Sequence, residues 1–181
     1  MDYAANIRTV LDRATVEDIM LGTDWYRTAH ATAERFAREY GVSADTAARV
    51  IAVLSPRKRW AENVAAAETI MRAYASGSPV WAVAGMFGAN VRKANLIMGG
   101  NPDALSGPKV TRFYQNIMGI DHEVTVDVWA ARAASEGTIE APTIVQYREI
   151  ADAYRTVAHE QGIPASALQA IVWTVIRGKA H

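Results

Sequence analysis

The sequence predicts an all-helical protein of eight to ten helices. Apolar residues recur at intervals of three and four, caps and stop signals for helices follow each other closely, and strand patterns are nearly absent. Half of the 181 residues are apolar and about a fifth are charged, as in ordinary globular proteins. This length suits one sizeable domain or two small helical lobes, and we expect a single domain over residues 1–181.

Helix caps divide the chain into its expected elements. Thr15 and Asp18 form a capping-box pattern before a short helix, and Thr23 or Asp24 is expected to begin a long one that ends at Tyr40. Later helices are expected over residues 43–54, 60–76, 89–98, 108–118, 127–134, 142–161 and 164–177, with a short helical turn from Pro79, another turn at 101–102 and an extended stretch at 124–126.

The absence of cysteine removes several kinds of chemistry. It excludes disulfides, thiolate metal sites, iron–sulfur clusters and cysteine nucleophiles, and the four histidines show no metal-ligand spacing. No stretch approaches the roughly 18 uninterrupted apolar residues of a membrane span, and residues 1–10 lack the apolar run of a secretory signal. We therefore expect a soluble, cytoplasmic protein with no metal, cofactor or membrane contact.

The net charge is zero, which is unusual for a protein that binds nucleic acid. Residues 57–112 nevertheless hold eight Lys and Arg against three acids, a net charge of +5, while residues 1–56 sum to −2 and residues 113–181 to −3. This central segment could present one positive face to phosphates. The alternative is that its charges lie scattered on solvated helix faces.

The most informative stretch is residues 104–132, ALSGPKVTRFYQNIMGIDHEVTVDVWAAR. It consists of a glycine-containing turn, a helix that begins with a lysine, a short loop, and an aspartate at the start of the next helix. This pattern resembles the helix-hairpin-helix DNA glycosylase superfamily, in which a glycine-rich hairpin precedes a lysine, an apolar helix and a Val-Asp pair. Lys109 and Asp127 have the separation expected in the lysine-bearing branches, and Arg132 lies where those branches often place an arginine.

Two upstream stretches extend the resemblance. Residues 51–71, IAVLSPRKRWAENVAAAETIM, are similar to the family's helix that ends in Leu-Ser, its DNA-facing loop and a following helix rich in small residues. Residues 88–98, GANVRKANLIM, resemble the segment with a Lys-Ala pair that precedes the hairpin. The resemblance implies a two-lobed helix-hairpin-helix glycosylase fold, with the hairpin and catalytic segment at about residues 101–134.

The resemblance also implies a chemistry. Such enzymes flip a nucleotide out of the duplex into a pocket, while a loop residue fills the vacated stack. Asp127 would stabilise the positive charge that builds on the sugar and would orient or deprotonate the nucleophile. Lys109 would attack the sugar carbon as a neutral amine, and Arg112, one turn further along, could help to keep it neutral.

DNA contacts are expected at the loop before the small-residue helix and around the hairpin. The loop from Ser55 to Trp60 would enter the duplex, and the turn at Gly107 would offer backbone N–H groups to one phosphate. Trp60 lies beside three basic residues, a combination that suits unpaired nucleic acid. The expected DNA-binding residues are Ser55, Arg57, Lys58, Arg59, Trp60, Gly107, Arg112 and Arg132.

The chain departs from the family pattern in ways that indicate a divergent branch. The usual hairpin has two glycines, but here Gly107 supplies only the second, and Pro108 removes one N–H donor. Trp129 replaces the family's frequent histidine two residues after the aspartate. The interval between the Lys-Ala segment and the hairpin is also shorter than usual.

Each of these residues also has an ordinary structural interpretation. A lysine in the first turn of a helix is commonly a surface residue, and an aspartate after an extended stretch is commonly an N-cap. His122 is expected to be a loop residue, with acid–base chemistry as a lesser alternative. The aromatic residues expected to serve in packing rather than base stacking are Trp25, Tyr26, Trp81 and Trp173.

The expected function is that of a DNA glycosylase-like enzyme that acts on a flipped, modified base, as in DNA repair. One alternative is a base-hypermodifying transferase, similar to virus-encoded glycosylase-like proteins of the bacteriophage type that modify thymine derivatives. Another is a non-catalytic DNA-binding module of the same fold. A purely protein-binding helical adaptor is favoured only by the zero net charge.

Overall fold

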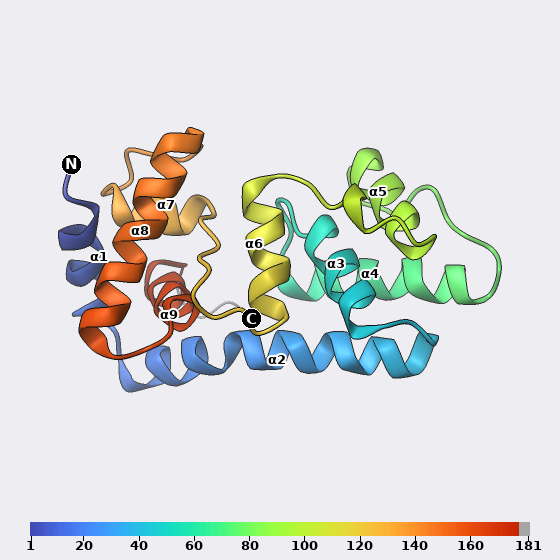
Figure 1. Ribbon diagram of the computed structural model, residues 1–181, viewed down its shortest axis with the longest axis horizontal. Helices are drawn as coiled ribbons and strands as arrows, with labels where there is room; N and C mark the ends of the chain where they lie inside the picture. Colours follow the sequence, from blue (N-terminus) through green and yellow to red (C-terminus); the bar gives the residue numbers. More distant parts are fainter. Residues whose placement is uncertain (178–181) are drawn as a thin grey trace. The chain divides into compact units, whose positions relative to one another are not determined.

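The structure, a computed structural model, describes residues 1–177 and is all-helical over that range (Figure 1). It contains nine α-helices, one 3₁₀ helix and no strand among these residues, which confirms the predicted fold class and helix number. The elements are α1 (Tyr3–Leu11), α2 (Val16–Tyr40), α3 (Ala44–Leu54), α4 (Trp60–Ala75), α5 (Gly88–Met98), the 3₁₀ helix η1 (Pro102–Ala104), α6 (Pro108–Ile117), α7 (Val128–Ala134), α8 (Ile144–Gln161) and α9 (Ala165–Arg177). Within residues 1–177, none of the helices has the length and apolar character needed to cross a membrane.

Local capping signals place most helix boundaries. Ser43 accepts a hydrogen bond from the amide of Thr46 at 3.0 Å and begins α3 as predicted. Thr143 begins α8 in a reciprocal capping box with Gln146. Gly162 closes α8 in the left-handed conformation, with φ of 65°, which a glycine adopts without steric cost.

The N-terminal half differs from the expected elements in three ways. The two helices expected before Tyr40 are one continuous helix, α2, which begins at the predicted box of Thr15 and Asp18, so Thr23 and Asp24 lie inside it. No helix forms after Pro79, where the chain runs irregularly to the start of α5. Helix α1 was not predicted, although Asp2 caps it by accepting a hydrogen bond from the amide of Ala5 at 2.9 Å.

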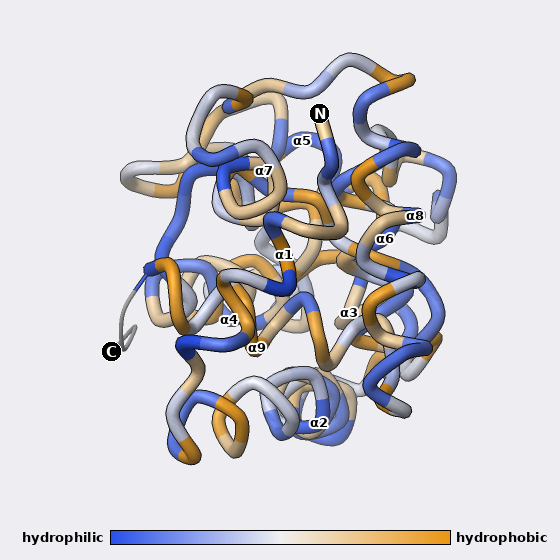
Figure 2. The backbone as a smooth tube through the Cα atoms, turned by 90° about the vertical axis from the view of Figure 1, so that its left-hand side faces the viewer, coloured by the Kyte–Doolittle hydropathy of each residue, from blue (hydrophilic) through white to orange (hydrophobic). Residues whose placement is uncertain are grey.

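The chain divides into two compact units. Unit 1 comprises Met1–Thr28 and Gly119–His181, of which the structure describes residues through 177, and unit 2 comprises Ala29–Met118. Unit 1 therefore contains α1, the first half of α2, and α7 to α9, whereas unit 2 contains the second half of α2 and the helices α3 to α6. In Figure 2, hydrophilic and hydrophobic residues are interspersed along α2, as expected for a helix with one apolar face.

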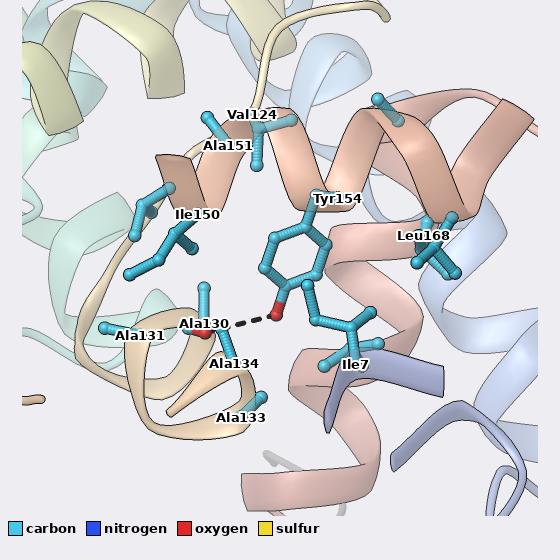
Figure 3. Packing of buried hydrophobic residues seen from close by; sticks show 14 of the residues in the cluster. Ile7, Val124, Ala130, Ala131, Ala133, Ala134, Ile150, Ala151, Tyr154 and Leu168 are labelled. Atoms are coloured by element: carbon cyan, nitrogen blue, oxygen red, sulfur yellow. Dashed lines mark hydrogen bonds between the residues drawn. The ribbon is translucent and has the colours of Figure 1, made fainter. Parts of the chain in front are cut away.

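Unit 1 has its core where α1, α7, α8 and α9 pack against each other. Small residues of α7, including Ala130 and Ala134, let the neighbouring helices approach closely. The fully buried ring of Tyr154 from α8 lies among Ile7, Leu168 and these alanines, and its hydroxyl donates a hydrogen bond to the carbonyl of Ala130 (Figure 3). Such large buried side chains supply most of the apolar area that stabilises a helical core.

Unit 2 is built around α3, which packs against α4, α5 and α6. Seven of its eleven residues are buried, including every residue from Val50 to Leu54. A helix that is apolar on most of its surface has to be covered on several sides, which explains why three helices surround it. Because α3 is packed on several sides, the position of its C-terminal end in unit 2 is fixed. The loop that follows α3 therefore begins at a fixed position.

Gly22 marks a close helix contact in unit 1. A Cβ atom added to this residue would lie 2.5 Å from the backbone N and Cα atoms of Ile171 in α9, well inside van der Waals contact. The glycine thus allows α2 and α9 to touch through their backbones. Nearby, the hydroxyl of Tyr26 donates to the side chain of Gln169 at 2.8 Å, which fixes the same pair of helices.

We expect Gly22→Ala to lower the free energy of unfolding by about 1–3 kcal/mol, because α2 and α9 must move apart to admit the methyl group. Helix propensity alone predicts the opposite sign, since alanine favours a helix interior over glycine by about 1 kcal/mol. Thr23→Ala, at the exposed neighbouring position, is the control and should change stability little. Urea unfolding monitored by circular dichroism measures both, and a more stable Gly22→Ala protein would contradict the contact.

Candidate functional site

A polar contact joins α6 to α3 in unit 2. The guanidinium of Arg49 binds the carboxylate of Asp45 at 2.7 Å and lies 4.2 Å from the centre of the Tyr114 ring. The Tyr114 hydroxyl donates a short hydrogen bond to Asp45. The start of α3 is thereby tied to the later part of α6, and the two helices run antiparallel (Figure 1).

The antiparallel packing brings two predicted segments to one end of unit 2. The loop after α3, residues 55–59, and the first turn of α6, which carries Lys109, both lie at this end (Figure 1). Two further contacts connect α5 and the segment before it to the same region. The Lys93 ammonium donates to the Ser106 hydroxyl at 2.7 Å, and the Lys58 ammonium lies 3.2 Å from where a Cβ of Gly85 would be. We call this region the basic end of unit 2.

The loop 55–59 has an irregular backbone. Ser55 caps the C-terminus of α3, its carbonyl accepts a hydrogen bond from the Lys58 amide at 3.1 Å, and its hydroxyl oxygen is buried with no hydrogen-bond partner. Arg57 adopts φ of 60°, the left-handed conformation that side chains other than glycine rarely take. Arg59 is the N-cap residue of α4 but provides no side-chain cap. The loop therefore exposes Arg57 and Arg59 to solvent.

The arginines of the basic end differ from the other arginines of unit 2 in whether their side chains have partners. Arg35, Arg38, Arg49 and Arg72 each lie within 4.0 Å of an acidic side chain, and Arg112 binds Gln115. Among the described residues, Arg57, Arg59 and Arg92 form no ion pair or hydrogen bond through their side chains. Unpaired arginines at one end of a unit leave their charge available to an anion.

The glycine before α6 has a conformational role. Gly107 adopts φ of 97° immediately before Pro108, which occupies the first position of α6. Its carbonyl accepts a hydrogen bond from the amide of Thr111 at 3.0 Å and so begins the helix. Lys109 follows as the second helical residue and is half-buried. The expected order of glycine turn, helix start and lysine is therefore present.

Asp127 is the N-cap of α7 in unit 1. One oxygen of its carboxylate, Oδ1, accepts hydrogen bonds from the amides of Trp129 at 3.0 Å and Ala130 at 2.8 Å. This is the ordinary structural role of an aspartate at this position.

Two buried tyrosines of α8 hold the backbone on both sides of Asp127. The hydroxyl of Tyr147 accepts a hydrogen bond from the amide of Val126 at 3.1 Å and donates one to the carbonyl of Val124 at 3.0 Å. Tyr154, two helical turns later, donates to the carbonyl of Ala130 in the first turn of α7 at 3.3 Å. The extended entry and the helix start that place Asp127 are both fixed by α8.

The hydroxyls near Asp127 are held in their neutral form. Burial raises the pKa of Tyr26 well above its usual range, a hydrogen bond with Thr125 opposes this, and the negative charge of Asp127 raises it further. Burial also raises the pKa of Tyr154, and Asp127 acts in the same direction. These tyrosines therefore stay protonated at physiological pH and act as hydrogen-bond donors.

The remaining predicted site residues have partners inside their own units. The Arg132 guanidinium forms an ion pair with Glu140 and lies 4.9 Å from the centre of the Trp129 ring. Trp60 is the first residue of α4 and is half-buried. Lys58 lies 3.8 Å from Glu62, one turn away. Contacts of these residues with DNA stay predictions.

The two residues predicted to carry the chemistry belong to different units. Lys109 lies in unit 2 and Asp127 in unit 1. Each is at the beginning of a helix, one as the second helical residue and the other as the cap. A common cleft for the two side chains stays a prediction.

The aromatic residues divide into packed and exposed ones. Trp25 contacts Tyr26 and Trp173 edge to face, with ring centroids 5.2 and 6.1 Å apart, which confirms packing for these three. The same expectation is wrong for Trp81, which is 62% exposed. Phe87, which the sequence did not single out, is 49% exposed.

Two other kinds of candidate group are His122 and possible clusters of metal ligands. His122 lies in an exposed turn, 3.9 Å from Glu123, as expected for a loop residue. Over residues 1–177, no group of three or more His, Asp or Glu side chains is arranged to hold a metal ion.

Comparison with known proteins gives one match. A family model matches residues 1–180. The chain belongs to a family of unknown function (DUF7178). No significant similarity connects it to a curated protein or to a solved structure.

The two units carry opposite charge. Unit 2 holds eleven Lys and Arg against six Asp and Glu, a net charge of +5, whereas unit 1 holds eight against thirteen, a net charge of −5. The zero net charge of the chain is therefore the sum of two strongly charged parts. A positive unit with unpaired arginines at one end is suited to polyanions.

Tyr147→Phe should lower the free energy of unfolding by about 1–3 kcal/mol, because it leaves the buried amide of Val126 without a partner. Tyr154→Phe is the matched control, since it removes a single, longer hydrogen bond to a carbonyl and should cost about 1 kcal/mol or less. Chemical unfolding of both variants gives the comparison. Equal losses would show that the Tyr147 bridge does not hold the entry to α7.

The Asp45 contact should make stability depend on pH. Burial raises the pKa of Asp45, but hydrogen bonds from Arg49 and Tyr114 outweigh it and lower the pKa below the usual value. A lowered pKa stabilises the fold above the unfolded value of about 3.9, and this contribution is lost as the pH falls through the folded value. Because the carboxylate is 43% exposed, we expect about 1 kcal/mol or less.

Unfolding of the parent and Asp45→Asn proteins at a series of pH values measures this contribution. The difference should be largest near neutral pH and should vanish below the folded pKa, where the parent carboxyl is protonated. Tyr114→Phe keeps the ion pair and should show a smaller loss at neutral pH. A difference between parent and Asp45→Asn that stays constant as the solution is acidified would contradict the assignment.

Proposed function

We propose that this protein is a DNA-acting enzyme of the helix-hairpin-helix glycosylase type, working on a flipped and modified base. The basic end of unit 2 carries the proposal, because it gathers the loop 55–59 and the Lys109 turn at one place and leaves arginines unpaired there. The two compact units would be the two lobes of such a fold. The opposite charges of the units would direct the DNA to unit 2.

The proposed division of labour follows from the position of each residue. Arg57 and Arg59 would contact phosphates, and the loop that carries them would enter the duplex when the nucleotide is flipped. Lys109 would attack the sugar carbon as the base leaves, which forms a carbon–nitrogen bond and breaks the glycosidic bond. Asp127 would stabilise the positive charge on the sugar in the transition state.

The cap formed by Asp127 is compatible with this role. Capping fixes the carboxylate at a helix N-terminus through Oδ1, and the two tyrosines of α8 fix the backbone around it. A catalytic group needs such support, because a small displacement reduces the rate strongly. The same geometry gives a clean variant, since asparagine caps a helix about as well as aspartate but carries no charge.

A second candidate is a DNA-binding module without activity. The observation that favours it is that Asp127 and Arg132 both have complete structural roles, as a helix cap and as the partner of Glu140. A protein-binding adaptor loses its main support, because the zero net charge conceals the net charge of +5 on unit 2.

Borohydride trapping tests the proposal. We expect the parent protein to form a covalent adduct with oligonucleotides that contain an abasic site or a modified thymine, because borohydride reduces the imine between Lys109 and the sugar. Lys109→Gln should form none, and the matched control Lys93→Gln, at another lysine of the basic end, should still form it. Asp127→Asn should fold normally but form the adduct about 100-fold more slowly with the base-containing substrate.

The outcomes separate the two candidates. An adduct that persists in Lys109→Gln would remove this lysine as the nucleophile. A parent protein that binds the oligonucleotides but never forms an adduct would support the binding module instead.

A further inference from the structure

The exposed hydrophobic residues of unit 2 are concentrated in one stretch of its chain. The large hydrophobic side chains that are exposed in this unit are Tyr74, Trp81, Phe87 and Leu96, at the end of α4, in the segment before α5 and on α5. Two of these residues, Trp81 and Phe87, bracket a segment without helix. Exposed aromatic rings on a positively charged unit are the kind of side chain on which a nucleobase can stack.

The segment 80–88 is held against the basic end. The side-chain amide of Asn95 donates to the carbonyl of Val80 at 2.9 Å, which fixes the backbone beside Trp81 to the second half of α5. At the other end of the segment, Phe87 is the N-cap residue of α5. The two anchor points are eight residues apart along α5, or about 12 Å, the length of a few nucleotides of an extended strand.

Two cations flank Phe87. The Lys58 ammonium lies 3.2 Å from the Cβ position of Gly85, and the guanidinium of Arg92 lies 3.6 Å from that of Gly88. The Lys58 charge is shared with Glu62 at 3.8 Å, whereas Arg92 has no ion-pair partner among the described residues. Both cations thus lie next to glycine backbone, at positions two residues before and one residue after Phe87.

We propose that the segment 80–88, with Lys58 and Arg92, binds unpaired DNA, with bases stacked on Trp81 and Phe87 and phosphates beside the two cations. Aromatic rings bind bases of any sequence through their π-faces, and neighbouring cations bind the backbone. An apolar protein partner fits less well, because cations flank the aromatic surface. This inference rests on the proposed function and adds a contact for the strand outside the duplex.

Fluorescence anisotropy with two probes tests the inference on the full chain. One probe is a labelled thymidine oligonucleotide of about ten nucleotides, and the other is a duplex of the same length. We expect Trp81→Ala and Phe87→Ala each to weaken oligonucleotide binding about tenfold or more, since stacking contributes that much per base. Duplex binding should change less than about threefold, because phosphate contacts dominate it.

Two matched variants distinguish the loss of base stacking from the loss of apolar surface and from the loss of the folded structure. Leu96→Ala removes a side chain that is as exposed as Phe87, at 49%, but carries no ring, and it should bind the oligonucleotide like the parent. Phe87→Tyr keeps the ring and should also keep the affinity. Because all of these positions are exposed, the variants should unfold at the parent's denaturant concentration.

The results distinguish this inference from the proposed function. If the parent binds the duplex but the aromatic variants bind the oligonucleotide like the parent, the stacking surface is refuted and the proposed function stands. Equal weakening for both probes also refutes it, because the aromatic residues then serve the duplex. A parent that binds neither probe would overturn the inference together with the proposed function.

Discussion

The contact among Asp45, Arg49 and Tyr114 is the interaction on which the arrangement of unit 2 depends. It joins the start of α3 to the later part of α6, and the two helices run antiparallel. The end of α3 and the beginning of α6 thereby arrive at the same end of the unit. If α6 ran the other way, Lys109 would lie far from the loop 55–59, and the unpaired arginines would not have the Gly107 turn beside them.

Much of the fold could be predicted because helix signals are local. Ser43 and Thr143 begin helices through bonds to residues three positions away, and a reader of the sequence can find such pairs. The continuity of α2 could not be predicted in this way. A glycine occupies position 22 inside the helix because it makes room for the backbone of Ile171, a residue far away in the sequence. The candidate site shows the same limit: the cap at Asp127 is visible in the sequence, but the hydroxyl of Tyr147 that fixes its entry is not.

The exposure of Trp81 illustrates a different reason for failure. Residue type favours burial for tryptophan, but burial depends on whether a helix forms after Pro79, and none does. The total charge of the chain is also a poor guide to function. A sum over the chain averages the positive and negative units to zero, although a binding partner meets the local potential of one surface.

Arg57 has a consequence for the evolution and engineering of this chain. Its left-handed backbone costs about 1–2 kcal/mol relative to glycine, which adopts the same conformation freely. Selection for thermal resistance alone would therefore replace this arginine by glycine, and a stability-guided redesign would choose the same substitution. If a basic side chain nevertheless persists at this strained position, selection acts on what that side chain contacts. Such selection opposes selection for a more stable fold.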